Sequence, residues 1–189
     1  MIFFEEIKGL DDNSYYAYYM KYQLAPVILG NKSAMTFTIA LKEEKVASKI
    51  RVLKIIYSLD LKVMILRETS TSCILLIYCK KMIEKIISEP KKKAVLVKLG
   101  YPVQSVFTAL SYLRKRYTQV GCPAEIGIFL GFPLEDVEDY MSGTNKKCLR
   151  CGYWQVYNNL DQAEKTFKVY DEAKKVMLNQ LLCELKLSS

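Results

Sequence analysis

The sequence predicts an α+β fold, in which a small three-stranded sheet, formed by one strand plus a hairpin, is packed in helices and the C-terminal half is mainly helical. Three observations support this class. A run rich in Thr, Phe and Ile at 35–41 is typical of a strand, and two apolar runs at 62–67 and 73–78 have the length of paired strands. From residue 80 onward, apolar residues recur at the spacing of one helix face.

The first predicted helix spans residues 13–25. Asn13 or Ser14 can cap its first turn, and Pro26 is expected to end it. Four tyrosines at helical spacing favour a core stripe over an exposed platform for stacking bases or a flat cofactor. They are Tyr15, Tyr18, Tyr19 and Tyr22. A second helix is predicted at 43–58, where apolar side chains at intervals of three and four residues form one stripe.

The two apolar runs of the hairpin are joined by five polar residues at 68–72, which is short enough for a tight connection. Both runs are apolar almost throughout, so we expect helices to cover the sheet on both faces. After Cys79 only helices are expected, and the first of them ends before Pro90. Their predicted ranges are 80–88, 102–118, 124–130, 134–141 and 160–186. No repeat or flexible linker interrupts the sequence, which predicts a single domain over 1–189.

Composition narrows the possible functions. The chain contains no histidine, which excludes Ser-His-Asp and Cys-His catalysis and histidine-containing zinc sites within it. No other catalytic constellation is recognised, so enzyme activity is left open. The net charge of +8 favours contact with phosphates, acidic proteins or anionic lipids without distinguishing them. No secretory signal pattern and no apolar run of the roughly 20 residues that span a bilayer is present, so we expect a cytoplasmic protein without membrane insertion.

Six cysteines in an intracellular chain do not indicate a disulfide framework. Cys148 and Cys151 form a C-x-x-C motif before a glycine, which is half of a zinc or iron knuckle, and Cys122 is the candidate third ligand. Neighbouring lysine and arginine residues favour the alternative of dithiol redox exchange. A third interpretation is that these thiols neither bind a metal nor take part in a redox reaction. The remaining cysteines are expected to be small core residues; they are Cys73, Cys79 and Cys183.

The segment from Cys122 to Met141 predicts a tight helix-turn-helix. Gly131 suits the left-handed residue that closes a helix, and Pro133 suits the start of the next one. A DNA-binding role would bring the second helix against phosphates, but this helix carries four acidic residues and no Lys or Arg. Its acids are Glu135, Asp136, Glu138 and Asp139. Nonspecific nucleic-acid binding by lysine-rich segments elsewhere remains a weaker alternative to plain solvated faces.

The first functional hypothesis is a binding or adaptor module with a protein partner, because the chain combines a good core with no acid-base pair and no phosphate loop. Its surface includes the acidic helix at 134–141 and the neighbouring segment 148–157. The candidate binding residues are Glu125, Glu135, Asp136, Tyr153, Trp154 and Tyr157. The second hypothesis is an accessory protein in iron, haem or thiol redox handling that uses the C-x-x-C segment, with zinc or iron as the possible cofactor.

Three segments of the C-terminal half carry a family resemblance. They are CPAEIGIFLGFPLEDV at 122–137, CGYWQVY at 151–157 and AEKTFKVY at 163–170. In order and spacing they resemble the bacterial domain of unknown function family numbered 3793. This resemblance implies a small cytoplasmic protein of anaerobic, clostridium-like bacteria. It brings no established activity, ligand or catalytic residue.

Overall fold

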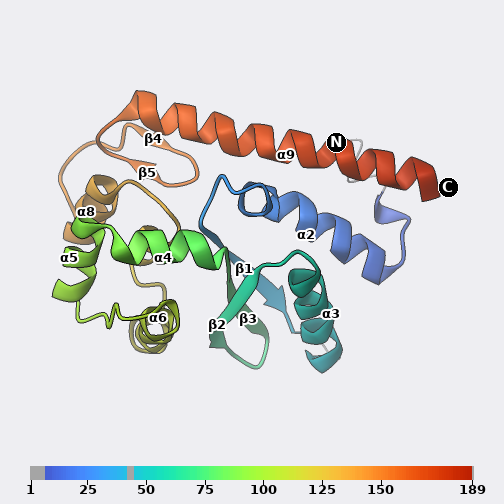
Figure 1. Cartoon of the computed structure of the whole chain (residues 1–189), viewed down its shortest axis with the longest axis horizontal. Coiled ribbons are helices and arrows are strands. Elements are labelled where there is room, and N and C mark those ends of the chain that lie inside the picture. The colour runs from blue at the N-terminus through green and yellow to red at the C-terminus, as the bar shows by residue number, and fades with distance from the viewer. Residues whose placement is uncertain (1–6, 42–44, 189) are drawn as a thin grey trace.

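The computed structural model describes residues 7–41 and 45–188. Labels follow Figure 1. The first half contains α2 (Asp12–Ile28), β1 (Ala34–Ala40), α3 (Lys45–Ser58), β2 (Lys62–Glu68) and β3 (Ser72–Tyr78). The second half contains α4 (Lys80–Ser88), α5 (Pro90–Lys98), α6 (Val106–Val120), α7 (Ile126–Phe129), α8 (Leu134–Ser142), β4 (Arg150–Cys151), β5 (Gln155–Val156) and α9 (Leu160–Ser188).

The predicted three-stranded sheet is confirmed. Its order is β1-β3-β2, both pairs are antiparallel, and β2 and β3 form the expected hairpin. Because β3 is central, successive residues of this strand serve two different cores. Leu75 and Ile77 join the cluster beneath α2 and α3, whereas Leu76 and Tyr78 join the cluster beneath α4 and α6. The sheet is therefore covered on both faces, which explains why its sequence lacks polar alternation.

The long helix α9 lies along α2 on the outside of the molecule (Figure 1). Met177 and Leu181 of α9 are buried together with Ala25 of α2. The tyrosine stripe of α2 packs against this cluster half-buried, as the predicted core role requires. Tyr16 lies off the stripe, where the Arg51 guanidinium stands 5.4 Å from its ring centre.

Both ends of the first helix differ from the prediction. Asp11 performs the capping, since its carboxylate accepts hydrogen bonds from the backbone N–H and the hydroxyl of Ser14 at 3.2 and 2.6 Å. At the other end, α2 continues through Pro26 to Ile28. The chain turns only after this point, where the N–H groups of Asn31 and Lys32 donate to the Pro26 carbonyl. Pro26 lies too near the end of the helix to disrupt more than its last turn.

The C-terminal half also departs from an all-helical chain. Pro90 does not simply follow α4; it begins α5, because proline has no N–H to lose in the first turn of a helix. Two short strands, β4 and β5, form a second small sheet after α8, so the expectation of no strand beyond Cys79 is wrong. Strands of two residues are too short to show a period of two.

Candidate functional site

The candidate site is framed by the turn between α7 and α8 and by the β4–β5 hairpin. Gly131 has a φ of +79°, in the left-handed region predicted for it. A Cβ at this position would stand 2.9 Å from Ser33 Oγ. The Ser33 hydroxyl donates a hydrogen bond of 2.8 Å to the Phe129 carbonyl. The loop after α2 therefore holds the helical turn in place.

Asp136 in the first turn of α8 ties this helix to the hairpin. Its carboxylate is only 3% exposed. One oxygen accepts from Trp154 Nε1 at 2.8 Å, and the other accepts from the backbone N–H of Tyr157 and from Asn158, at 2.9 to 3.0 Å. Asp136, a candidate binding residue, is thus an internal acceptor that positions Trp154.

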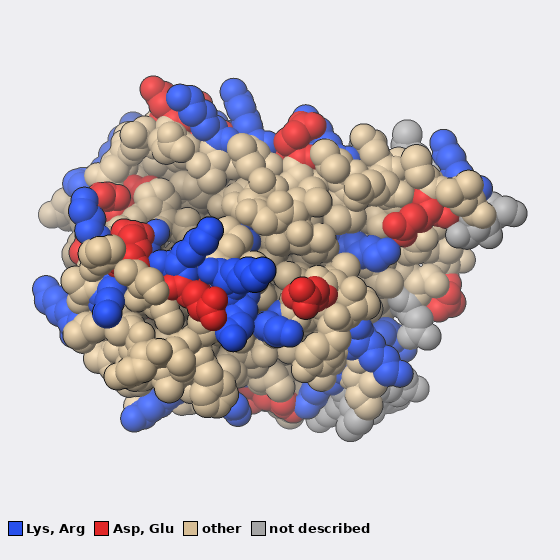
Figure 2. All heavy atoms as spheres, in the orientation of Figure 1, with Lys and Arg blue, Asp and Glu red and all other residues tan. Residues whose placement is uncertain are grey.

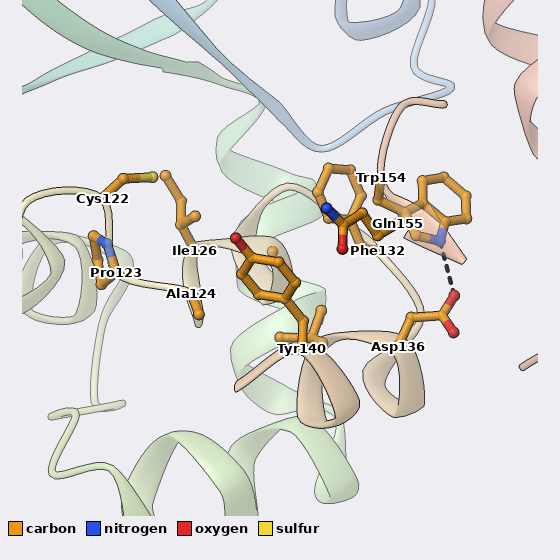
Figure 3. Close-up of a pocket in the computed structure, with 11 residues that line it drawn as sticks. Cys122, Pro123, Ala124, Ile126, Phe132, Asp136, Tyr140, Trp154 and Gln155 are labelled. Atoms are coloured by element: carbon orange, nitrogen blue, oxygen red, sulfur yellow. Dashed lines mark hydrogen bonds between the residues drawn. The ribbon is translucent and has the colours of Figure 1, made fainter. Parts of the chain in front are cut away.

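A cavity of about 270 Å³ opens between α8, the hairpin and the segment before α7 (Figure 3). Val137 and Tyr140 of α8 form part of its wall, and Ala124, Phe132 and Trp154 form much of the rest. These side chains present mainly carbon. The cavity lies within the segment from Cys122 to Tyr157 that the sequence singled out, and it is suited to an apolar group.

A few polar groups border this cavity. Gln155 lines the cavity, and its side-chain oxygen accepts a 2.6 Å hydrogen bond from the Tyr157 hydroxyl. Tyr157 therefore orients Gln155. At the opposite end, Cys122 Sγ accepts a hydrogen bond of 3.2 Å from the Tyr117 hydroxyl. Tyr140 is 52% exposed and lies at the rim.

Glu125 lies behind the pocket rather than in it. Its carboxylate is 3% exposed and accepts from Arg116 Nε at 2.8 Å and from the Tyr101 hydroxyl at 3.0 Å. Burial by itself raises the pKa of Glu125, but hydrogen bonds from Arg116, from the backbone and from Tyr101 outweigh it and leave the pKa below its usual value. This candidate residue therefore joins α6 to the start of α7.

The two thiols of the C-x-x-C motif lie together on the hairpin. Cys148 Sγ and Cys151 Sγ are 3.3 Å apart, and Cys151 is exposed while Cys148 is half-buried. The hydrogen bond between them raises the pKa of Cys151. Cys122 lies at the pocket, next to Tyr117. Among residues 7–41 and 45–188, no group of three or more Cys, Asp or Glu side chains is placed to hold a metal ion.

The other cysteines follow the core prediction only in part. Cys73 is buried and Cys79 half-buried, but Cys183 is exposed on α9. The apolar neighbours of Cys183 in the sequence face α2, and helix periodicity turns Cys183 itself away from them.

The hairpin packs against α9 through a cluster of aromatic side chains. The Trp154 ring stands edge-on to Phe167, with centres 4.5 Å apart, and Tyr153 packs on Tyr170. Gly152 lies so close to Phe167 that any Cβ at this position would overlap the ring. The Tyr153 hydroxyl donates to Asp171 at 2.7 Å. Tyr153 and Trp154 are therefore anchored to the body of the molecule, and Trp154 also faces the pocket.

Sequence reasoning missed Lys32, which is only 5% exposed. Its ammonium donates to the Leu130 carbonyl at 3.2 Å and stands 4.4 and 4.9 Å from the ring centres of Phe132 and Tyr170. Burial, followed by repulsion from Lys174, lowers its pKa to about 7. No local motif marks this residue, because its partners come from distant parts of the chain.

Glu135 and Glu138 of α8 are exposed, and neither lines the pocket, to which the same helix contributes Val137 and Tyr140. Figure 2 shows Lys and Arg side chains gathered over α4, with Asp and Glu among them. No described helix is long and apolar enough to cross a membrane.

The fold and the pocket define a small α+β protein with a helical turn and a hairpin around one apolar cavity. The chain belongs to the family described as "Protein of unknown function (DUF3793)", whose model matches residues 20–189. Comparison with curated proteins and with solved structures gives no match.

Proposed function

We propose that this protein is a cytoplasmic binding module, whose pocket receives one aromatic side chain of a partner protein. The observation that carries the proposal is the cavity between α8 and the hairpin, walled by Phe132, Tyr140 and Trp154. Aromatic walls favour an aromatic guest, because rings gain from edge and face contacts in addition to buried area.

The size of the cavity favours a single side chain over a drug-sized molecule. Its volume of about 270 Å³ lies just below the usual range of small-molecule pockets, about 300 to 1,000 Å³. Protein interfaces concentrate their binding energy in a few aromatic or arginine anchors that fill such pockets. Asp136 and Tyr157 hold Trp154 and Gln155 in place before any partner arrives, which reduces the entropy lost on binding.

The charges on α8, the helix that supplies Val137 and Tyr140 to the pocket wall, indicate which residues should flank the aromatic anchor of the partner. Glu135 and Glu138 are exposed on α8, whereas Asp139 is already paired with Lys146 at 2.7 Å. Although the whole chain carries a net charge of +8, the exposed face of α8 carries acidic side chains. We therefore expect the partner segment to carry lysine or arginine on either side of its aromatic residue.

Short acetylated and amidated peptides test this proposal directly. The probe is Lys-Phe-Lys, and the comparisons are Lys-Ala-Lys and Glu-Phe-Glu. Trp154 is the only tryptophan of the chain and faces the pocket, so its fluorescence reports binding at this position. We expect saturable binding of Lys-Phe-Lys, with a Kd of about 1 mM for so small a ligand. Both comparison peptides should bind at least about tenfold more weakly.

Matched variants separate the pocket from the rest of the surface. Ala124→Phe places a ring in the cavity and should abolish the fluorescence response, whereas Ala94→Phe on the exposed side of α5 should leave it unchanged. Glu135→Gln together with Glu138→Gln should weaken binding and remove its dependence on salt. Equal binding of all three peptides, or binding that survives Ala124→Phe, would contradict the proposal.

A further inference from the structure

The thiol pair on the hairpin has a geometry that the binding role does not use. Cys148 Sγ and Cys151 Sγ are 3.3 Å apart, compared with about 2.05 Å in a disulfide. The two sulfur atoms are therefore already in contact before any bond forms. We propose that Cys148 and Cys151 form a thiol–disulfide exchange site that reduces an accessible disulfide and closes into an intramolecular disulfide.

The hairpin fixes the backbone on both sides of the pair. The Leu149 N–H donates to the Val156 carbonyl at 2.8 Å, and Cys151 is paired with Gln155 across the strands. Before the pair, Lys146 Nζ binds the side chains of Asp139 and Asn158 at 2.7 and 3.0 Å. The backbone therefore holds the two thiols close together before they react, which lowers the entropy lost in forming the disulfide.

The unequal exposure of the two thiols assigns their order of reaction. At alkaline pH, where the thiol of Cys151 ionises despite its raised pKa, the exposed Cys151 thiolate attacks one sulfur of an external disulfide R–S–S–R, forms a mixed disulfide and releases RS⁻, which takes up a proton. Cys148 then loses its proton, and its thiolate attacks the Cys151 sulfur and releases the second RSH. The protein gives up two thiol hydrogens and is oxidised, while R–S–S–R is reduced to two thiols. An external dithiol reverses both steps.

The nearby charges favour an anionic disulfide as the oxidant. Lys147 is exposed next to Cys148, and Arg150, between the two cysteines, forms an ion pair with Glu164. Glutathione disulfide supplies a suitable probe of this class. The same chemistry also serves a protein disulfide, so a second arm uses a small protein with one exposed disulfide.

The test is incubation of the full chain with glutathione disulfide, followed by alkylation of free thiols and tryptic mapping. Arg150 lies between the two cysteines, so trypsin converts an intramolecular bond into peptides 148–150 and 151–165 that are linked to each other. We expect this linked pair as the main product. In Cys148→Ser, Cys151 should instead remain as a mixed disulfide with glutathione, released at least about a hundredfold more slowly than in the natural chain. Cys151→Ser should react more slowly, because Cys148 is half-buried.

The exposed cysteines outside the hairpin provide the matched control. Cys122→Ser combined with Cys183→Ser should leave formation of the linked peptides unchanged. Mixed disulfides forming at equal rates on Cys122, Cys151 and Cys183, with no linked peptides, would overturn the proposal. In the protein arm, a mixed disulfide trapped by Cys148→Ser supports a protein substrate, and its absence restricts the site to small disulfides. None of these outcomes depends on peptide binding in the pocket.

Discussion

Replacing Lys32 by methionine removes a buried charge while keeping most of the volume of the side chain. Burial lowers the pKa of Lys32 from 10.5 to about 7. At 1.36 kcal/mol per pKa unit, keeping this group in the fold at neutral pH costs about 4 to 5 kcal/mol. The rings of Phe132 and Tyr170 favour the ammonium form and offset part of this cost, by about 0.5 to 2 kcal/mol each. We therefore expect Lys32→Met to be more stable than the natural chain by about 2 kcal/mol at pH 7.

The dependence on pH has a definite sign. Between about pH 7 and pH 10.5 the unfolded chain holds the Lys32 proton and the folded chain does not, so stability rises with pH in this window. Below pH 7 the buried charge of Lys32 lowers the stability of the fold by its full amount. This loss disappears as the pH approaches 10.5. The advantage of Lys32→Met should therefore shrink by up to about 1.4 kcal/mol for each pH unit above 7.

Urea unfolding of both proteins, followed by Trp154 fluorescence at about pH 6, 7.5 and 9, measures this difference. Lys91→Met, at an exposed position of α5, is the control and should follow the natural chain throughout. Lys174→Gln removes the repelling neighbour and should raise the pKa of Lys32. Parallel pH profiles for the natural chain and Lys32→Met, or a destabilised Lys32→Met at pH 6, would refute the reasoning.

Three further substitutions test the internal contacts of the site. Asp136→Ala leaves the buried Trp154 N–H without its acceptor and should lower the free energy of unfolding by roughly 3 kcal/mol in a urea titration; an unchanged midpoint would show that Asp136 does not hold the hairpin. Gly152→Ala should cost about 1 to 3 kcal/mol by the same assay, because its Cβ overlaps Phe167, and Phe167→Leu should recover part of that loss. The lowered pKa of Glu125 contributes stability above its usual value of 4.5 that is lost as the pH falls through the lowered pKa. Acid unfolding of the natural chain should therefore be steeper than that of Glu125→Gln, and equal slopes would argue against this ion pair.

Local pattern was sufficient for much of the fold. The apolar runs at 62–67 and 73–78 predicted a hairpin covered on both faces, because a strand that serves two cores has no polar alternation. Gly131 was correctly predicted at a left-handed turn, since few other residues tolerate that conformation. The predicted end of the helix at 80–88 before Pro90 is confirmed, but α5, which begins at Pro90, was not predicted, because proline is common both after one helix and in the first turn of the next.

The roles of the polar residues were decided by tertiary structure. The sequence marked Glu125 and Asp136 as candidate binding groups, but each has partners inside the fold. Acidic side chains in one short segment look alike until their burial is known, because a buried carboxylate must find donors and an exposed one need not.

Composition and periodicity alone predicted the class of fold, the absence of histidine chemistry and the segment that contains the candidate pocket. Contacts made in the folded chain bring Cys148 next to Cys151, leave Cys122 at the pocket and bury Lys32, and none of these could be predicted from local pattern. Lys32 and the Leu130 carbonyl are 98 positions apart in the sequence. Periodicity in the sequence indicates which face of a helix or strand is buried. The pKa of a lysine and the partner of a thiol depend instead on groups from distant parts of the chain, which come together only on folding.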